Sequence, residues 1–288
     1  MDMTKEEIGF EFVPTGFDEE INFLRRGNLV VLAGRPMMGK TALATCIVSN
    51  IPEEEAVLYI SLGNPTEEIV KNAIEYHCRH KYSFDKCPSP EDFQNKLNAV
   101  KKLKSKDITF FGREIFFDEI RNSVDSFLKK KTVSMIIVDD LQHILLRDAE
   151  LSAYENIKNR NAILAYFKKI ARDNNLVSLV LCNCSRKSDE RLGHLPKITD
   201  FDDCEPEIYA DTMAFIVRRS FYDPIDRPGM AELYFKKGDL EGNYNLLWMP
   251  KEHFGMFNSK ENYTTNTCNG FLKDEEIPAF KPFVGNQG

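Results

Sequence analysis

The eight residues Gly34 to Thr41, GRPMMGKT, constrain this chain more than any other stretch of its sequence. They follow the apolar run LVVLAG and precede ALATCIVSN, which is compatible with a helix. The pattern GxxxxGK[ST] between a strand and a helix predicts a P-loop, because glycines let successive N–H groups turn inward toward phosphate oxygens. The free N–H groups and positive dipole end of the following helix add to this anion site. The sequence therefore predicts an α/β fold with a nucleotide's phosphates held at the end of a strand.

The ligands of a bound nucleotide and its metal can be assigned within this motif. Lys40 would reach the β- and γ-phosphates of ATP, and the Thr41 hydroxyl would ligate Mg²⁺. Asp139 ends the apolar run SMIIVDD and would complete the Mg²⁺ shell, the alternative being a carboxylate that caps the next helix. The residues predicted to surround the phosphates are Gly34, Arg35, Pro36, Met37, Met38, Gly39, Lys40, Thr41 and Ala42.

Strands and helices are predicted to alternate along the chain. Apolar, β-branched runs predict strands, and apolar residues at helical spacing predict the helices between them. Since the long strands are not half-polar, we expect a mainly parallel central sheet with helices on both faces and extra antiparallel C-terminal strands. Strands are predicted at 28–34, 56–62, 108–111, 134–140, 176–185, 212–222, 231–237 and 244–250, and helices from Gly39 and at 65–80, 82–107, 116–131 and 153–175.

Composition narrows the class of protein. The 288 residues are 42% hydrophobic, which is enough for a packed core, and no apolar run reaches the roughly 20 residues that a membrane helix needs. The N-terminus does not have a secretory pattern, and seven cysteines fit reduced thiols, so we expect a cytoplasmic protein. A net charge of −7 argues against a generally basic nucleic-acid binder but leaves a local basic groove open.

Three segments together resemble a known family. PTGFDEEINFLRRGNLVVLAGRPMMGKTALA, VDDLQHI and ADTMAFIVRRSFY are similar to the motor domain of DnaB-type replicative DNA helicases, which are RecA-like ATPases. The resemblance covers about 14–257, so we expect a lead-in at 1–13, a RecA-like ATPase domain at 14–257 and a tail at 258–288. It implies a RecA-like P-loop NTPase that uses ATP and Mg²⁺ in DNA replication. It also implies a ring of about six subunits that grips single-stranded DNA and meets other replication proteins.

The chain departs from the family pattern where the chemistry is expected. Gly63 stands where the family has a glutamate that positions the attacking water, and Asn183 stands at the position that senses the γ-phosphate. Lys237 keeps the lysine that the family sends into a neighbour's ATP site. Asp239 replaces the accompanying arginine, a type of residue worth about 10³–10⁵ in rate in phosphoryl transfer.

These departures leave two functions open. The candidate catalytic residues are Asp139, Asp140 and Asn183. Asp140 could orient water in place of the missing glutamate, or it could simply cap the following helix. One reading is an ATPase that moves on single-stranded DNA, and the alternative is a helicase relative that binds ATP, hydrolyses it slowly and acts as a switch or adaptor in replication.

Loops after two predicted strands could contact single-stranded DNA. Basic side chains there would bind DNA phosphates in a salt-dependent way, although neighbouring acidic side chains weaken their positive electrostatic field. The alternative is ordinary solvated loops. The basic residues concerned are Arg147, Lys158, Arg160, Arg186, Lys187 and Arg191.

Overall fold

The fold is a single sheet with helices on both sides, seen in a computed structural model. The structure describes residues 23–78, 89–112, 116–146, 152–191, 193–239, 241–242, 244–249 and 257–258. The strands are β1 (Leu29–Gly34), β2 (Ala56–Ser61), β3 (Asp107–Phe111), β4 (Met135–Asp139), β5 (Val177–Asn183), β6 (Thr212–Val217), β7 (Met230–Lys237), β8 (Tyr244–Trp248) and β9 (Phe257–Asn258).

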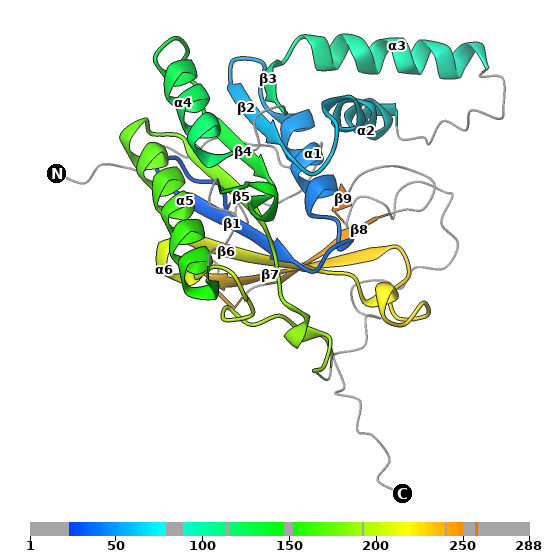
Figure 1. Cartoon of the computed structure of the whole chain (residues 1–288). Helices are drawn as coiled ribbons and strands as arrows, with labels where there is room; N and C mark the ends of the chain where they lie inside the picture. The colour runs from blue at the N-terminus through cyan, green and yellow to red at the C-terminus, as the bar shows by residue number, and fades with distance from the viewer. Residues whose placement is uncertain are drawn as a thin grey trace, which may run out of the picture.

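The strand order confirms the expected class. Within the described residues the order across the sheet is β3-β2-β4-β5-β1-β6-β7-β8-β9 (Figure 1). The pairs from β3 to β6 are parallel. The pairs from β6 to β9 are antiparallel. The protein is thus an α/β fold with a mainly parallel sheet and antiparallel C-terminal strands.

The longer helices are α1 (Lys40–Asn50), α2 (Thr66–Cys78), α3 (Pro90–Lys104), α4 (Phe117–Leu128) and α5 (Ala153–Asp173). Helices α1, α2, α4 and α5 lie on the two sides of the sheet, and α3 packs on the outer side of α2 (Figure 1). Short helices are α6 (Pro206–Tyr209), η2 (Leu141–His143), η3 (Arg186–Ser188) and η4 (Arg219–Phe221). Helices α1 and α2 contribute to one buried cluster, and α4 and α5 contribute to the other, so they cover opposite faces (Figure 1). None of the helices in the described part of the chain is long and apolar enough to cross a bilayer.

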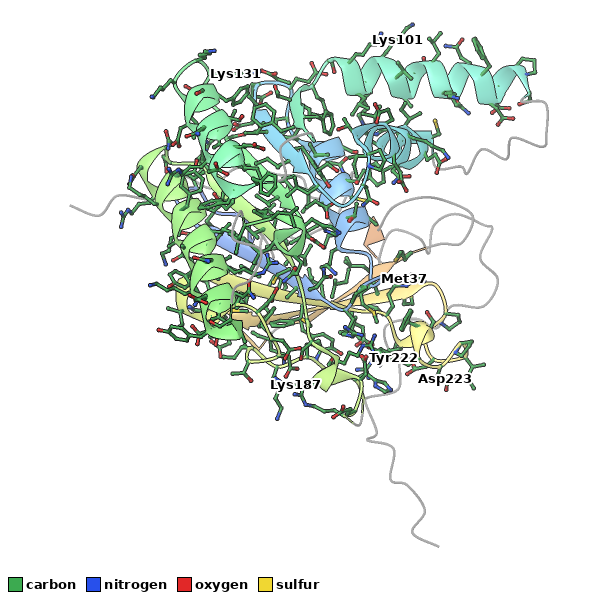
Figure 2. All side chains as sticks on the ribbon, in the orientation of Figure 1. Met37, Lys101, Lys131, Lys187, Tyr222 and Asp223 are labelled. Carbon is green, nitrogen blue, oxygen red and sulfur yellow. The ribbon has the colours of Figure 1, made fainter. Side chains whose placement is uncertain are left out.

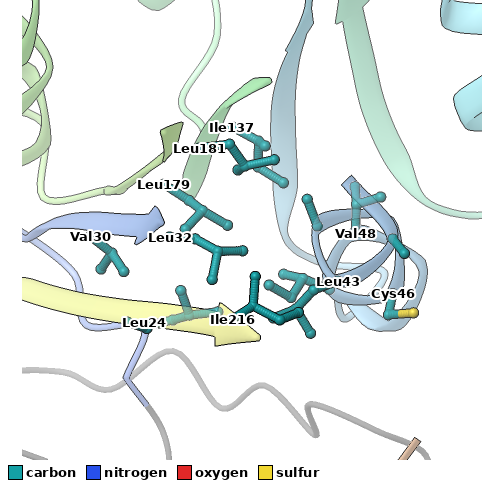
Figure 3. Packing of buried hydrophobic residues seen from close by; sticks show 14 of the residues in the cluster. Leu24, Val30, Leu32, Leu43, Cys46, Val48, Ile137, Leu179, Leu181 and Ile216 are labelled. Carbon is teal, nitrogen blue, oxygen red and sulfur yellow. The ribbon is translucent and has the colours of Figure 1, made fainter. Parts of the chain in front are cut away.

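The side chains of β1 point alternately to the two faces of the sheet and so belong to two separate buried layers. Val30 and Leu32 belong to the cluster that includes Leu43 of α1 (Figure 3). Val31 belongs to the cluster on the opposite face, with Phe167 of α5. Successive side chains of a strand point to opposite faces, so a strand buried on both sides must be apolar throughout. This is the reason that LVVLAG is a continuous apolar run.

Local sequence sets where α5 begins. Ser152 Oγ accepts a hydrogen bond from the Glu155 N–H at 3.3 Å, and Glu155 Oε2 accepts one from the Ser152 N–H at 2.9 Å. This reciprocal capping box satisfies two backbone donors that the helix itself leaves unpaired. The predicted start at residue 153 is therefore confirmed.

Several predicted elements end earlier in the structure than expected. The strand predicted at 212–222 ends at Val217, because Arg219 turns its guanidinium inward to Glu232 and the chain forms η4. The helix predicted at 82–107 ends at Lys104, and Asp107 already begins β3.

Several expectations fall on residues that the structure does not describe. The lead-in at 1–13 lies outside the described residues, as do 79–88 and 259–288. Asn258, where the tail is expected to begin, still pairs with Leu247 of β8.

Candidate functional site

The candidate site lies where the parallel strands end. The register of the sheet places Gly34 of β1 beside Asn183 of β5, and Ser61 of β2 beside Asp139 of β4. Parallel strands present their carboxyl ends at one edge, and α1 begins at that edge with Lys40. The structure therefore brings together the residues predicted from the P-loop motif, from SMIIVDD and from the strand at 176–185.

The loop needs its two glycines for different reasons. Gly39 caps α1 with a φ of 101°, a left-handed conformation that glycine adopts without strain. Gly34 needs space, because a Cβ there would lie 2.8 Å from the carbonyl oxygen of Ile216 in β6. A side chain at position 34 would therefore push β1 and β6 apart.

The remaining loop residues are fixed by contacts beyond the motif. The Arg35 guanidinium binds Asp189 at 3.0 Å, which joins the loop to the segment after β5. Arg218 donates its backbone N–H to the sulfur of Met38 at 3.2 Å and its side chain to the Met37 carbonyl at 3.3 Å. Figure 2 shows Met37 at the tip of the loop, where its side chain is 75% exposed. Among the predicted loop residues, Pro36 and Met37 are exposed, whereas Met38, Lys40 and Ala42 are buried.

Lys40 lies beneath the loop and is held by three acceptors. Its Nζ donates to the carbonyls of Gly34 and Arg35 at 3.0 and 3.1 Å, and to Asn183 Oδ1 at 2.8 Å. Burial lowers the pKa of Lys40 below its ordinary value, against the opposing effect of Asp140 and other nearby groups. A desolvated ammonium whose hydrogen bonds all go to uncharged acceptors favours the approach of an anion, as the phosphate assignment requires.

Asp139 and Thr41 form a pair suited to a hard cation. Thr41 Oγ1 donates to Asp139 Oδ1 at 3.1 Å, and the Tyr59 hydroxyl donates to Asp139 Oδ2 at 2.9 Å. Burial raises the pKa of Asp139 above its ordinary value although both hydrogen bonds act to lower it. A divalent cation would supply the positive charge that this desolvated carboxylate needs, so the residues fit Mg²⁺.

The rest of a Mg²⁺ shell would come from outside the protein. Among the described residues there is no group of three or more His, Cys, Asp or Glu side chains that could hold a metal. Mg²⁺ commonly takes one or two protein oxygens and completes its octahedron with phosphate oxygens and water. This pattern matches a metal that arrives with a nucleotide.

Asn183 connects the lysine to the second aspartate. Its Oδ1 accepts from Lys40, and its Nδ2 donates to Asp140 Oδ2 at 2.8 Å. Asp140 Oδ1 in turn accepts from the backbone N–H of His143 at 3.2 Å and contacts His143 Nδ1 at 2.5 Å. Asp140 thus caps η2, one of its two predicted roles, and it also belongs to the hydrogen-bonded line that starts at Lys40.

Sequence reasoning missed two residues of this line. Gln142 Oε1 accepts the backbone N–H of Asn183 at 2.8 Å, which fixes the backbone at the end of β5. His143 lies against Gly63, since a Cβ on Gly63 would be 3.0 Å from the histidine ring. Two features of the sequence could have indicated this contact: position 63 has no side chain, and a histidine follows Asp140 by three residues.

Lys237 does not join this site. It lies at the end of β7 beside Met213, near the start of β6, whereas the P-loop lies beside the end of β6. Its Nζ donates to the carbonyl of Glu207 at 2.6 Å. Asp239 forms an ion pair with Arg25 of the same chain.

Three of the basic residues expected to contact DNA are paired with acids. Arg160 binds Asp203 at 2.8 Å, and Arg191 forms an ion pair with the buried Asp200. Lys187, labelled in Figure 2, binds Asp202 at 3.0 Å, and both of these side chains are more than half exposed. Arg147 lies outside the described residues.

Comparison with known families assigns the chain. The sequence model of the family described as "DnaB-like helicase C terminal domain" matches residues 10–247. The chain belongs to this family. Relatives include a probable plasmid replicative DNA helicase of Chlamydia psittaci, which is 30% identical over an alignment of 244 residues and is matched over 78% of this chain and 50% of the relative. Replicative DNA helicase DnaC of Bacillus subtilis (strain 168) is 27% identical over 73% of this chain and 48% of its own length. The DnaB-like chain thus spans about half the length of these curated relatives.

Solved structures agree on the fold. A DnaB-like replicative helicase, described with its interactions with primase, aligns with a TM-score of 0.72 and 24% identity over 81% of this chain and 59% of its own. A second solved structure, described as an ATPase domain, aligns with a TM-score of 0.70 and 23% identity over 81% of this chain and 85% of its own. At this level of identity the alignments establish a RecA-like ATPase fold and nothing finer.

Proposed function

We propose that this chain is the ATP-binding motor domain of a DnaB-type replicative helicase, which hydrolyses ATP with Mg²⁺ and couples hydrolysis to movement along single-stranded DNA. One observation carries the proposal: Lys40, Asn183 and Asp140 form a hydrogen-bonded line beside the Thr41–Asp139 pair. A lysine, an amide and acidic oxygens are what a magnesium–triphosphate complex needs at its phosphate end. Membership of a family of replicative helicases supports the choice of nucleic-acid work over other uses of ATP.

The protein's own groups would act as follows. Lys40 would exchange its carbonyl contacts for phosphate oxygens and neutralise charge that develops on the leaving group. Asn183 would detect the terminal phosphate through the same amide that now holds Lys40, because a shift of the ammonium must move that amide. Thr41 and Asp139 would hold Mg²⁺, whose positive charge would help to neutralise the phosphates.

The ring, the DNA and the protein partners are part of the same proposal. Lys237 lies beside the start of β6, at the end of the strands opposite to the P-loop of the same chain. This position suits a head-to-tail ring in which Lys237 contacts the nucleotide of the neighbouring subunit. It would first have to release the Glu207 carbonyl. Arg160, Arg191 and Lys187 are all ion-paired, but the Lys187–Asp202 pair is more than half exposed, so Lys187 can most readily exchange its partner for a DNA phosphate.

The residues at positions 63 and 239 favour a second function, that of a switch or adaptor. Gly63 offers no carboxylate to orient water, and Asp239 is an acid paired with Arg25 where the family uses an arginine. A chain with these residues could bind ATP tightly, turn it over slowly and act as a switch or adaptor in replication.

Turnover measurements separate the two functions. ATP hydrolysis by the full chain is measured with and without single-stranded DNA, beside a Lys40→Ala control, and ATP affinity is measured by calorimetry with Mg²⁺. Hydrolysis that DNA stimulates and that the control abolishes supports the motor. Tight binding with turnover no faster than the control supports the switch, and no detectable binding refutes both.

A further inference from the structure

The His143 ring occupies a specific place at the phosphate edge of the sheet. It belongs to η2, which begins two residues after Asp139, and its side chain is 53% exposed. The ring packs on Gly63, which follows β2: a Cβ on Gly63 would meet Cε1 at 3.0 Å, Nδ1 at 3.1 Å and Nε2 at 3.7 Å. An imidazole therefore fills the space where position 63 would otherwise project a side chain.

The glycine at position 63 is explained by this ring and not by the backbone. Gly63 does not adopt a left-handed φ, so an ordinary L-residue could take its backbone conformation. Any side chain there would start within 3.1 Å of two ring atoms, which is tighter than most Cβ contacts in proteins, so the ring would have to move. The small residue at 63 and the histidine at 143 thus form one arrangement.

The ring is also oriented by a carboxylate. Asp140 Oδ1 contacts His143 Nδ1 at 2.5 Å, and the backbone N–H of His143 bonds the same oxygen, so the aspartate fixes both the ring and its helix turn. With Nδ1 directed to the carboxylate, Nε2 is the ring nitrogen left for a further hydrogen bond. A base held by a carboxylate in this way is the arrangement that proton-transfer sites use on many folds.

The oriented ring is joined to the phosphate lysine. Asp140 Oδ2 accepts from Asn183 Nδ2 at 2.8 Å, and Asn183 Oδ1 accepts from Lys40 at 2.8 Å. The imidazole is therefore three hydrogen bonds from the ammonium assigned to the β- and γ-phosphates, and its positioning carboxylate, Asp140, directly follows the aspartate assigned to Mg²⁺.

We propose that His143 is the catalytic base of ATP hydrolysis in this chain and that Asp140 is its positioning residue. The proposal rests on the proposed ATPase function. A water oxygen forms a bond to the γ-phosphorus while the bond from that phosphorus to the β–γ bridging oxygen breaks. ADP leaves with the bond's electron pair, and the proton of the water passes to His143 Nε2. The half-exposed ring then releases this proton to solvent, which leaves ADP, phosphate and one proton.

Three variants of the full chain test this assignment. His143→Leu removes the base, and turnover is expected to fall about 10²–10⁴-fold, the usual contribution of general acid–base catalysis. The dissociation constant for ATP should stay within about threefold, because His143 does not hold the phosphates. The double variant Gly63→Glu/His143→Leu places a carboxylate over the same spot once the ring is gone, and it should recover at least about tenfold of the lost rate. His77→Gln, at the far end of α2, is the matched histidine control and should keep the wild-type rate.

The outcomes separate the proposal from the function on which it rests. If the wild-type chain turns over ATP and His143→Leu does so at a similar rate, the assignment to His143 is overturned and the ATPase function stands. If His143→Leu loses turnover and ATP binding together, the ring is structural and the assignment again fails. If the wild-type chain is no faster than Lys40→Ala, both the hydrolysis and its base are refuted. Loss of turnover with ATP affinity retained, followed by recovery in the double variant, establishes the base.

Discussion

A buried ion cluster between β7 and η4 gives the sharpest stability prediction. Glu232 of β7 is 1% exposed, and its Oε2 accepts from Arg219 Nε at 3.1 Å. Arg227 and the Tyr234 hydroxyl also bind this carboxylate. Arg219 is itself buried and reaches the Gly193 carbonyl with another of its nitrogens. Each of the two buried charges is therefore compensated by the other.

Removing one partner should lower the free energy of unfolding far more than removing both partners together. In Glu232→Ala the Arg219 guanidinium stays buried without its carboxylate, so we expect a loss of about 3–5 kcal/mol in the free energy of unfolding. Glu232→Gln keeps the shape and one acceptor and should lose about 1–3 kcal/mol. Replacing both partners, as Glu232→Leu/Arg219→Leu, removes both charges and should leave stability within about 2 kcal/mol of the wild type. Arg227 adds little to the loss because it is partly exposed and can turn to water.

Urea unfolding followed by circular dichroism measures these differences, and the double-mutant cycle gives the coupling between the two side chains. The coupling should be at least about 1.5 kcal/mol, in the upper part of the range for residues in contact. The reasoning is refuted if Glu232→Ala costs less than about 1 kcal/mol, or if the double variant is as unstable as the sum of the two single ones. Glu241→Ala, an exposed acid after β7, is the matched control and should change stability by less than about 0.5 kcal/mol.

Three further predictions follow from individual contacts. Gly34→Ala should lower the free energy of unfolding by about 2–3 kcal/mol in urea titrations, because its Cβ would lie 2.8 Å from the Ile216 carbonyl; an unchanged midpoint would contradict this. Lys40→Met should leave the ligand-free protein as stable or more stable, since it removes a desolvated ammonium, yet weaken ATP binding at least about 100-fold by calorimetry. Burial, aided by nearby lysines, lowers the pKa of His77 from 6.5 to about 4, so the fold favours the neutral ring. Stability should therefore be complete above pH 6.5 and fall by on the order of 1–2 kcal/mol toward pH 4, after allowance for partial exposure. His77→Gln should lack this part of the loss, and identical pH profiles for the two proteins would refute it.

Most of the fold followed from local patterns. The run LVVLAG, the glycine–lysine motif and the amphipathic stretch 153–175 each identify an element within a few residues of its bounds. The extent of the last strands was harder to predict, because Arg219 ends β6 through a partner, Glu232, that lies on the next strand. Hydrophobic pattern carries no information about such a partner.

Some residues of the candidate site were likewise predicted from local patterns, and others were not. Gly34, Lys40, Thr41 and Asp139 were predicted from motifs whose spacing reflects how a short loop surrounds a phosphate. The contact of His143 with Gly63 was not predicted, since the two residues lie on segments that become neighbours only when β2 pairs with β4.

By itself, the sequence determined that this chain builds a mainly parallel sheet with the loop GRPMMGKT at the carboxyl end of its first strand. Short-range rules suffice for that, because glycine conformations, helix caps and apolar runs act within a few residues of each other. Only the tertiary structure decided that Asn183 joins Lys40 to Asp140, and that a histidine fills the space over Gly63. These contacts require groups from different segments of the chain to be placed correctly to within a few tenths of an ångström, and hydrogen bonding and packing achieve this only after the sheet has formed.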